Sequence, residues 1–333
     1  MSRPALTVLT NPAAPATERA YKRVRSLGRQ ILKPGSQGLA PSPYPGHYAL
    51  VRSVVEGLRA IDADFNFNPA SFSQIARVVY APANEALLQA MELKRRGAVD
   101  FLVAGPTNAL FVDDCDSILQ RPEIDLVIVP SAWTMDFYRG VPSVVAKSRV
   151  CPCGVDAEVW APAATRKEQS AVVYWKSGDE RFCEEVEAMV RRCGLEPLRV
   201  RARAGEHNLF TPEALRDMLN RSAVAVFLST FETQGIALAE AWSMNVPTVV
   251  WDPRGAAEWQ GRTFTSGSSA PYLTPATGIA ARDTASLEPA IGQALATLDS
   301  FQPREWVLAN MTDAICSRKL YELIMNEARA RRD

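Results

Sequence analysis

Two glutamates and one glycine stand at a spacing that suits the binding of an anionic ligand. Glu232 and Glu240 are separated by seven residues, and Gly235 lies between them, just before a run of helix-forming residues at 236–244. The first N–H groups of a helix have no acceptor within the helix, so they can bind an anion such as a diphosphate. Both carboxylates can face the pocket at this helix start, one from the loop and one from the helix.

The residues on either side predict a strand, a loop, a helix and a second strand. Residues 223–228 are almost all apolar and rich in β-branched side chains, which is typical of a strand buried on both faces of a parallel sheet. A second apolar run follows at 247–251. In such a βαβ unit the ligand binds at the carboxyl ends of the strands. The loop that carries Glu232 lies at one of these ends.

This segment resembles a known family. The E-x7-E pair Glu232/Glu240, the E-x-x-G that ends at Gly235, and the run that continues to Pro247 are similar to the donor-site signature of group 1 retaining glycosyltransferases. The resemblance implies an α/β protein with the GT-B fold, in which two Rossmann-like domains present parallel sheets to each other across a cleft. It also implies that a sugar passes from a nucleoside-diphosphate sugar to an acceptor hydroxyl with retention of configuration, and that no metal or other cofactor is required.

The resemblance assigns roles to these residues. Glu240 accepts hydrogen bonds from the ribose hydroxyls of the donor, and Glu232 binds hydroxyls of the donor sugar and belongs to the catalytic set. The backbone after Glu232 holds phosphate or sugar oxygens, and four donor-binding residues are expected there: Thr233, Gln234, Gly235 and Ile236. The residues alone leave two alternatives open. Glu240 could merely pair with a neighbouring cation, and Glu232 could be a solvated loop residue.

Two cations are expected at the same site. In relatives the first strand of the second domain ends in an arginine, and a lysine follows five positions later; here Lys176 and Arg181 keep the spacing with the residue types exchanged. A departing nucleoside diphosphate develops negative charge, which fixed cations and a helix N-terminus can stabilise. We therefore expect Lys176 and Arg181 to be catalytic. Two basic residues at this spacing are also common on any protein surface.

A further donor-binding position is expected near the start of the first domain. Residues 34–46 are rich in Pro, Gly and Ser and predict a loop, and a helical pattern follows at 48–61. In the family, a glycine-containing loop at this place faces the donor phosphates, so Gly46 and His47 are candidates. A helix-capping or surface role is the alternative for His47.

The acceptor side departs from the family pattern. Many relatives have a histidine that contacts the sugar after the strand that corresponds to residues 100–104. This chain has Thr107 and Asn108 there. Amide and hydroxyl groups can also form hydrogen bonds with a sugar, so these two residues are the acceptor-side candidates.

Apolar runs alternate with helical patterns along the whole chain, which predicts parallel sheets of the Rossmann type. The Gly-Val-Asp tripeptide at 154–156 resembles the segment that introduces the second domain in the family. The predicted organisation is an acceptor-side domain at 1–152, a nucleotide-sugar-binding domain at 153–310 and a C-terminal helix at 311–333 that crosses back. The predicted strands are 5–10, 64–68, 76–80, 100–104, 125–129, 171–175, 198–203, 223–228, 247–251 and a closing strand at 277–283.

The composition limits the classes of partner that we expect for this chain. With 47% hydrophobic and 22% charged residues among 333, the chain is typical of a soluble globular protein. Its formal net charge of +0 disfavours nucleic acid as a partner. No apolar run approaches the ~20 residues of a membrane span, so we expect a cytoplasmic protein. A basic amphipathic pattern at 17–33 could contact the inner face of a membrane, and a solvated helix is the alternative.

The residues that commonly bind metals are few or scattered. Of six cysteines only Cys151 and Cys153 are close in sequence, and the two histidines do not complete a zinc site with them. The acidic cluster Asp113, Asp114 and Asp116 is interpreted as a solvated loop. We therefore expect no metal site.

The resulting hypothesis is a hexosyl-type glycosyltransferase in glycan or polysaccharide biosynthesis. Its acceptor would be a glycan, a lipid-linked glycan or a small molecule. One alternative is a nucleotide-sugar epimerase that uses the same pocket, although only two histidines could serve as an imidazole acid or base. The other is a sugar-nucleotide-binding protein without catalysis, an alternative that the missing family histidine keeps open.

Overall fold

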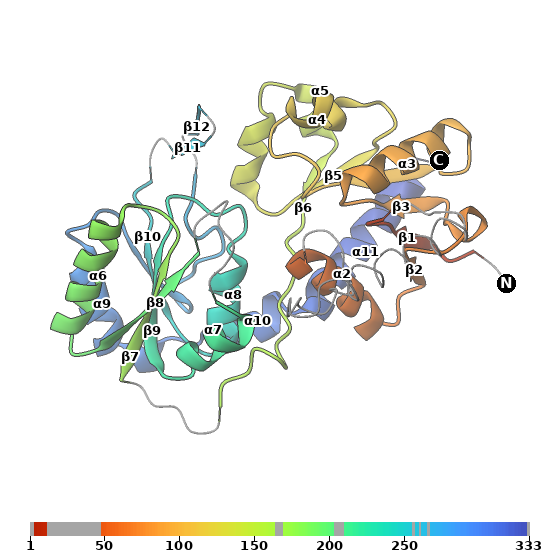
Figure 1. Cartoon of the computed structure of the whole chain (residues 1–333). Helices are drawn as coiled ribbons and strands as arrows, with labels where there is room; N and C mark the ends of the chain where they lie inside the picture. Colours follow the sequence, from red (N-terminus) through yellow and green to blue (C-terminus); the bar gives the residue numbers. More distant parts are fainter. Residues whose placement is uncertain are drawn as a thin grey trace, which may run out of the picture. The chain divides into compact units, whose positions relative to one another are not determined.

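The computed structural model describes residues 3–11, 48–163, 169–202, 210–254, 257–259, 261–264 and 267–331. Gly46, His47 and the basic segment 17–33 lie outside the described residues, so their roles stay predictions. The chain divides into two compact units (Figure 1). Unit 1 contains the described residues within 1–129, 137–151 and 317–333, and unit 2 contains those within 130–136 and 152–316.

Unit 1 is built on six parallel strands in the order β2-β1-β3-β4-β5-β6. Its inner strands are short apolar runs without alternation, because both faces of the sheet are covered. The sequence predicts all of these strands except β6. The strands are β1 (Leu6–Val8), β2 (Phe65–Phe67), β3 (Val78–Tyr80), β4 (Phe101–Ala104), β5 (Leu126–Val129) and β6 (Ser148–Val150).

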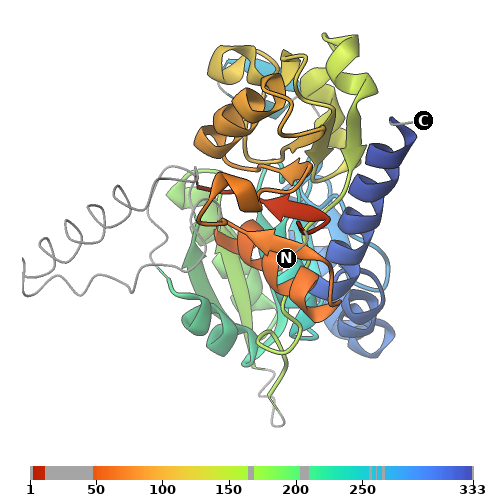
Figure 2. The ribbon, with the colours of Figure 1, turned by 90° about the vertical axis from the view of Figure 1, so that its right-hand side faces the viewer.

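Two helices of unit 1 pack on each other. The helix α2 (Tyr48–Ala60) buries apolar side chains that recur at helical spacing, among them Val51, Val54, Val55 and Leu58. The C-terminal helix α11 (Asp313–Ala330) belongs to this unit from Ser317 onward and is dark blue in Figure 2. The Ser317 hydroxyl lies 3.2 Å from the Ser53 carbonyl oxygen of α2. The remaining elements are α3 (Asn84–Arg95), α4 (Asp114–Ser117), α5 (Pro142–Ala146), η1 (Phe72–Gln74) and η2 (Ile118–Gln120), and η3 (Ala132–Tyr138) begins in unit 2.

Unit 2 is built on five parallel strands in the order β13-β10-β9-β7-β8. The central strand β9 is buried at every position, which agrees with its unbroken apolar sequence. β8 begins two residues before the predicted start at 198. The strands are β7 (Ser170–Trp175), β8 (Glu196–Arg201), β9 (Ser222–Leu228), β10 (Thr248–Trp251) and β13 (Gly278–Ala281).

Two layers of helices cover the faces of this second sheet (Figure 1). One layer holds α6 (Glu180–Arg192) and α9 (Leu287–Ala296). The other holds α7 (Pro212–Leu219), α8 (Ile236–Ser243) and α10 (Pro303–Asn310), and a short turn η4 (Leu298–Ser300) follows α9. Within the described ranges, we found no helix with the length and apolarity that a membrane crossing requires.

The sequence pattern is helical from residue 305 to the C-terminus, and in the structure this stretch forms two helices, the second of which corresponds to the predicted helix at 311–333. α10 ends at Asn310 and α11 begins at Asp313. Between them the Val155 N–H donates to the Met311 carbonyl at 3.0 Å, and the Asp313 N–H donates to the Val155 carbonyl at 3.1 Å. These long-range bonds with Val155 replace helical ones, and helical periodicity does not reveal them.

The structure also contains a short β-hairpin that the sequence does not predict. The strands β11 (Ala257–Trp259) and β12 (Arg262–Phe264) pair antiparallel. The sequence around 254–258 resembles only a G-x-x-E turn of the family and predicts no strand there. With three residues each, these strands are too short for an alternating pattern to be recognised.

Candidate active site

The loops after β7 and β9 are joined at the carboxyl edge of the sheet in unit 2. The N–H groups of Lys176 and Ser177, directly after β7, donate to the carbonyl of Leu228 at 3.0 and 2.9 Å. The Thr230 N–H donates to the Ser177 hydroxyl oxygen at 3.1 Å. The loop that carries Glu232 is thereby held beside the residue that follows β7.

Lys176 and Glu232 form a close ion pair. The ammonium nitrogen Nζ of Lys176 lies 2.8 Å from Oε1 and 2.7 Å from Oε2 of Glu232. The Glu232 side chain is 13% exposed and that of Lys176 is 31% exposed, so water screens the pair only in part. The structure thus brings together two of the three residues that the sequence predicts to be catalytic.

The backbone of Glu232 is held as firmly as its side chain. Its N–H donates to the Ser268 carbonyl at 2.8 Å, and its carbonyl accepts a hydrogen bond from the Trp133 indole at 2.9 Å. The Trp133 ring also meets Phe231 edge to face, with centroids 5.9 Å apart. The sequence does not identify Trp133 or Ser268 as partners of Glu232, because no local pattern marks a contact with a residue 99 or 36 positions away.

A buried carboxylate supports this arrangement from the next strand. Asp252 follows β10, is 2% exposed, and accepts the Ser269 N–H on Oδ1 at 3.1 Å. Its Oδ2 lies 2.6 Å from a guanidinium nitrogen of Arg282 and 3.1 Å from one of Arg254. Asp252 therefore fixes the segment whose Ser268 carbonyl binds the Glu232 backbone. In the sequence, the position of Asp252 directly after a predicted apolar strand could have marked it as a candidate site residue.

The start of α8 has the open geometry that the sequence predicts. Gly235 precedes the helix with φ 81° and ψ 58°, and no side chain caps the helix. This positive φ favours glycine, and a Cβ at Gly235 would also lie 2.7 Å from Cδ1 of Leu238 and displace that side chain. Ile236 is the first helical residue, and it and Thr233 are partly buried.

The Gln234 side chain has a structural partner. Its Oε1 accepts the Cys153 N–H at 3.0 Å, and its Nε2 donates to the Cys153 carbonyl at 2.7 Å. With both ends of the amide engaged, the part of Gln234 that remains for a ligand is its backbone, as the resemblance implies.

Glu232 and Glu240 act on a common aromatic residue. Tyr174 lies in β7, and its ring stacks on Phe227 with centroids 4.8 Å apart. Burial raises the pKa of the Tyr174 phenol, and the negative charges of Glu232 and Glu240 raise that pKa further. The charges of both carboxylates thus reach the same phenol, although Glu232 comes from the loop and Glu240 from α8.

Comparison with known proteins adds to this geometry. Neither a protein-family model nor a curated protein matches the sequence. Solved structures match nearly the whole chain. Sucrose-phosphate synthase from Thermosynechococcus elongatus has a TM-score of 0.54 at 15% identity, over 98% of this chain and 100% of that one. HepE from Anabaena, in complex with UDP and glucose, has a TM-score of 0.59 at 10% identity, over 97% and 100%.

A third solved structure, the lipopolysaccharide outer core galactosyltransferase WaaB, has a TM-score of 0.55 at 10% identity, over 97% of this chain and 99% of that one. All three similar proteins are glycosyltransferases with two parallel α/β sheets. The fold is GT-B. At these identities the likeness establishes the fold, which the motif predicted, and leaves the reaction to be argued from the site.

Within the GT-B fold, Arg181 is the predicted catalytic residue that the described contacts do not join to the others. It lies in the first turn of α6 with its side chain 85% exposed. Its Nε is 3.4 Å from Oε1 of Glu185, one turn along the same helix. The role of Arg181 in the site stays a prediction.

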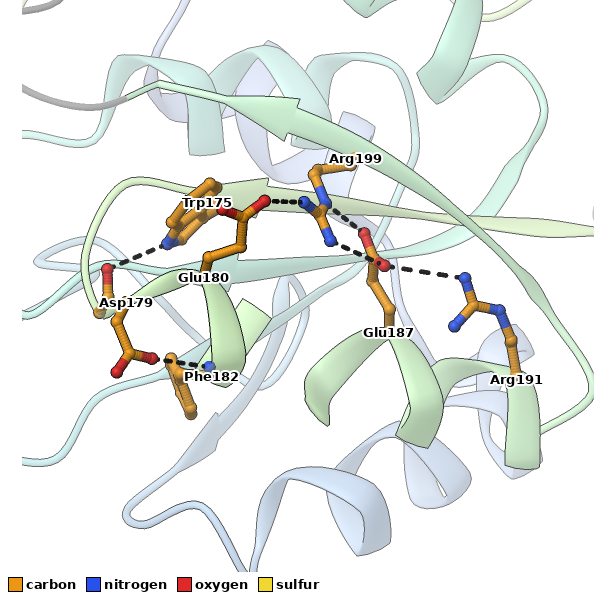
Figure 3. Close-up of polar contacts among 8 residues, drawn as sticks. Trp175, Asp179, Glu180, Phe182, Glu187, Arg191 and Arg199 are labelled. Atoms are coloured by element: carbon orange, nitrogen blue, oxygen red, sulfur yellow. Dashed lines mark hydrogen bonds and ion pairs between the residues drawn. The ribbon is translucent and has the colours of Figure 1, made fainter. Parts of the chain in front are cut away.

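A network around Trp175 holds the strand end that precedes Lys176 (Figure 3). The Trp175 indole donates to the Gly178 carbonyl at 3.3 Å and so closes the turn after β7. The guanidinium carbons of Arg199 and Arg201 lie 5.8 and 5.4 Å from the centre of the Trp175 ring. The Arg199 guanidinium in turn donates to both carboxylate oxygens of Glu187 in α6, at 2.5 and 3.0 Å. The turn with Lys176 is thus anchored to β8 and α6.

The acceptor-side candidates lie in unit 1 after β4. Asn108 is 2% exposed; its Oδ1 accepts the Gly105 N–H at 2.5 Å, and its Nδ2 donates to Asn84 at 3.1 Å. The Thr107 hydroxyl donates to the Pro82 carbonyl. The Asn108 amide thus supports the turn, whereas Thr107 is exposed. A contact of either residue with an acceptor stays a prediction.

In the acidic cluster of unit 1, the Asp114 carboxylate stabilises a local turn. Oδ2 of Asp114 accepts the N–H groups of Leu110 and Phe111 at 3.0 and 2.9 Å. Among the residues that the structure describes, no group of three or more His, Cys, Asp or Glu side chains is arranged to hold a metal ion.

Proposed function

We propose that this protein is a retaining glycosyltransferase that moves a sugar from a nucleoside-diphosphate sugar to an acceptor hydroxyl. The observation that carries the proposal is the contact of the Lys176 ammonium with both oxygens of Glu232, at 2.7 and 2.8 Å, at the carboxyl edge of the sheet in unit 2. The GT-B fold, the uncapped start of α8 and the effect of both glutamate charges on the pKa of Tyr174 support it.

The roles follow from the charges. As the bond to the anomeric carbon breaks, negative charge grows on the departing diphosphate. The Lys176 ammonium and the N–H groups at the start of α8 would stabilise that charge without a metal ion. Glu232 would accept hydrogen bonds from hydroxyls of the donor sugar, and Glu240 from the ribose of the nucleoside.

The solved structures suggest which ligands to test first. HepE is in complex with UDP and with UDP-glucose, and starch synthase IV from Arabidopsis thaliana is bound to ADP and acarbose. We infer by analogy that this protein takes a nucleoside-diphosphate hexose, with UDP-sugars the first choice. A glycan acceptor follows from the same analogy, with lipid-linked and small-molecule acceptors as further arms of the screen.

A thermal-shift screen against UDP-, ADP-, GDP- and dTDP-sugars tests donor binding, since a ligand that binds only the folded state raises the unfolding temperature. The matched control is Lys176→Gln, which removes the ammonium and retains an amide donor. We expect one nucleotide class to stabilise the native protein and to stabilise the variant less. No shift with any donor at millimolar concentration would contradict the proposal.

The best donor is then incubated with an acceptor panel, and the product's anomeric configuration is read by NMR. Transfer with the donor's configuration kept supports a retaining enzyme. Formation of a donor epimer in the absence of acceptor would support the epimerase instead, and binding without any turnover would support the non-catalytic alternative.

A further inference from the structure

Unit 1 contains a cavity that the proposed reaction does not use. Its volume of about 350 Å³ lies within the ~300–1,000 Å³ that is usual for small-molecule sites. Phe101 and Leu126, the first residues of β4 and β5, contribute to its wall together with α5 and the last turn of α11. The cavity therefore lies at the amino edge of the sheet, whereas Thr107 and Asn108 follow the carboxyl end of β4.

Lys147 lines this cavity without a carboxylate partner in the described part of the chain. Its Nζ donates to the backbone carbonyls of Arg121 and Ile124 at 3.2 and 3.1 Å. An ammonium group has three N–H donors, so one donor remains beyond these two. Burial lowers the pKa of Lys147, and the nearby charges of Arg331 and Lys94 lower it further, whereas the charges of Asp125 and Glu123 raise it.

Asp125, the carboxylate that acts most strongly on the charge of Lys147, already has other partners. Asp125 is 5% exposed and accepts hydrogen bonds from Lys94, Arg331 and the Leu102 N–H. Lys94 and Arg331 pair with Asp125, and Lys147 lines the same cavity, so these three cations and one carboxylate leave a local excess of two positive charges.

The other charged pair at the cavity does not offset this excess. Arg149 and Glu327 lie 2.8 Å apart and neutralise each other. Glu123, which also acts on the charge of Lys147, is paired with Arg95 at 2.6 Å. Because Glu327 and Glu123 are already paired with arginines, they do not neutralise the excess of positive charge around Lys147.

From this combination of shape and charge we propose that the cavity binds a small phosphate monoester. A phosphate monoester carries about 1.5 to 2 negative charges at neutral pH, which matches the local excess better than a single carboxylate does. The remaining donor of Lys147 and the guanidinium of Arg331 bind the phosphate oxygens. The apolar walls formed by Phe101, Leu126 and Ala146 contact the organic part.

Calorimetric titration of the full-length protein with phenyl phosphate and with inorganic phosphate at low ionic strength tests the proposal. We expect phenyl phosphate to bind more tightly than inorganic phosphate. Lys147→Gln keeps amide donors for the two carbonyls but removes the charge, and we expect it to weaken binding about tenfold or more.

The proposed donor site could also bind phosphate, so Lys176→Gln is the matched control. We expect this variant to bind phenyl phosphate as the native protein does. Loss of binding in Lys176→Gln with full binding in Lys147→Gln would assign the phosphate to unit 2 and overturn the proposal. The absence of any dissociation constant below about 10 mM would also overturn it.

Arg331→Gln serves as a second variant in case Lys147→Gln does not fold. Arg331 is at the end of α11 and 58% exposed, so its loss should leave the fold intact. We expect weakened binding of phenyl phosphate by a variant that still unfolds cooperatively. Native affinity in a folded Arg331→Gln would contradict the predicted contact and, with it, the proposed site.

Discussion

At the scale of single residues, the Lys176–Glu232 pair is the main determinant of the site. Each charge is only partly exposed, and each depends on the other for compensation. A ligand with phosphate and hydroxyl groups could interact with both members at once. The pair can therefore act as a ligand-binding unit as well as a structural contact.

We predict that Lys176→Ala weakens nucleotide affinity by about 1.5–3 kcal/mol, the usual loss for a hydrogen bond with a charged group. Isothermal titration with the nucleotide found in the screen measures this loss. Arg181→Ala, measured in parallel, tests the assignment of Arg181: an equal loss supports its catalytic role, and native affinity limits the cationic role to Lys176.

Glu240→Ala should weaken nucleotide binding by about 1–3 kcal/mol, because the ribose hydroxyls lose an acceptor. Calorimetric affinity is the measurement. The exposed Glu184 of α6 provides a control, and Glu184→Ala should bind as the native protein does. Unchanged affinity in the Glu240 variant would remove Glu240 from the nucleotide site.

Burial raises the pKa of the Cys151 thiol from its ordinary value of 9.0 to about 11. Between these values the unfolded chain loses the proton and the folded chain keeps it, so stability falls as pH rises through the window. We predict a loss of about 1.4 kcal/mol per pH unit from this group. Urea unfolding at pH 8 to 11 measures it, and Cys151→Ala should show a shallower decline. Parallel declines would contradict the prediction.

At the scale of elements, the site depends on loops that meet at the carboxyl ends of neighbouring parallel strands. The loops after β7, β9 and β10 are joined through Ser177, Ser268 and Asp252. The position of Glu232 therefore depends on three strands, of which only β9 directly precedes its loop in the sequence.

Asp252 tests this dependence. Asp252→Asn keeps an oxygen that can accept the Ser269 N–H but loses the charge that pairs with Arg282, whereas Asp252→Ala loses both interactions. We predict that Asp252→Ala is less stable than Asp252→Asn by about 1–3 kcal/mol, as measured by urea unfolding. If the alanine variant were as stable as the asparagine variant, Oδ1 would not hold the 268–269 segment.

At the scale of the whole molecule, each unit has its own parallel sheet and core, and the candidate residues are divided between them. The donor-side residues of the described chain lie in unit 2, and Thr107 and Asn108 lie in unit 1. A nucleotide site built from these donor-side candidates would therefore use residues of unit 2 alone.

The proposed chemistry predicts that sugar transfer does not depend on a metal ion. Lys176 and the start of α8 supply the positive charge at the diphosphate. We expect the transfer rate to be the same before and after treatment with EDTA. A rate that falls with EDTA and recovers with Mg²⁺ or Mn²⁺ would contradict this.

The sequence by itself determined the fold class and the central motif. Runs such as 223–228 are apolar without alternation, and burial on both faces of a parallel sheet requires this pattern. The glutamate spacing around Gly235 and the helix start at Ile236 were likewise readable, since helix geometry is local. These features depend on residues that are close in sequence.

Only the tertiary structure decided which side chains meet. Lys176 and Glu232 are 56 positions apart, and Trp133 is 99 positions from the carbonyl it binds. The structural use of Gln234 and Asn108, the pairing of Arg181 with Glu185 and the break between α10 and α11 also came from the structure. Periodicity reports the environment of a residue and not the identity of its partner, because partners are chosen by contacts between distant segments that form only in the folded chain.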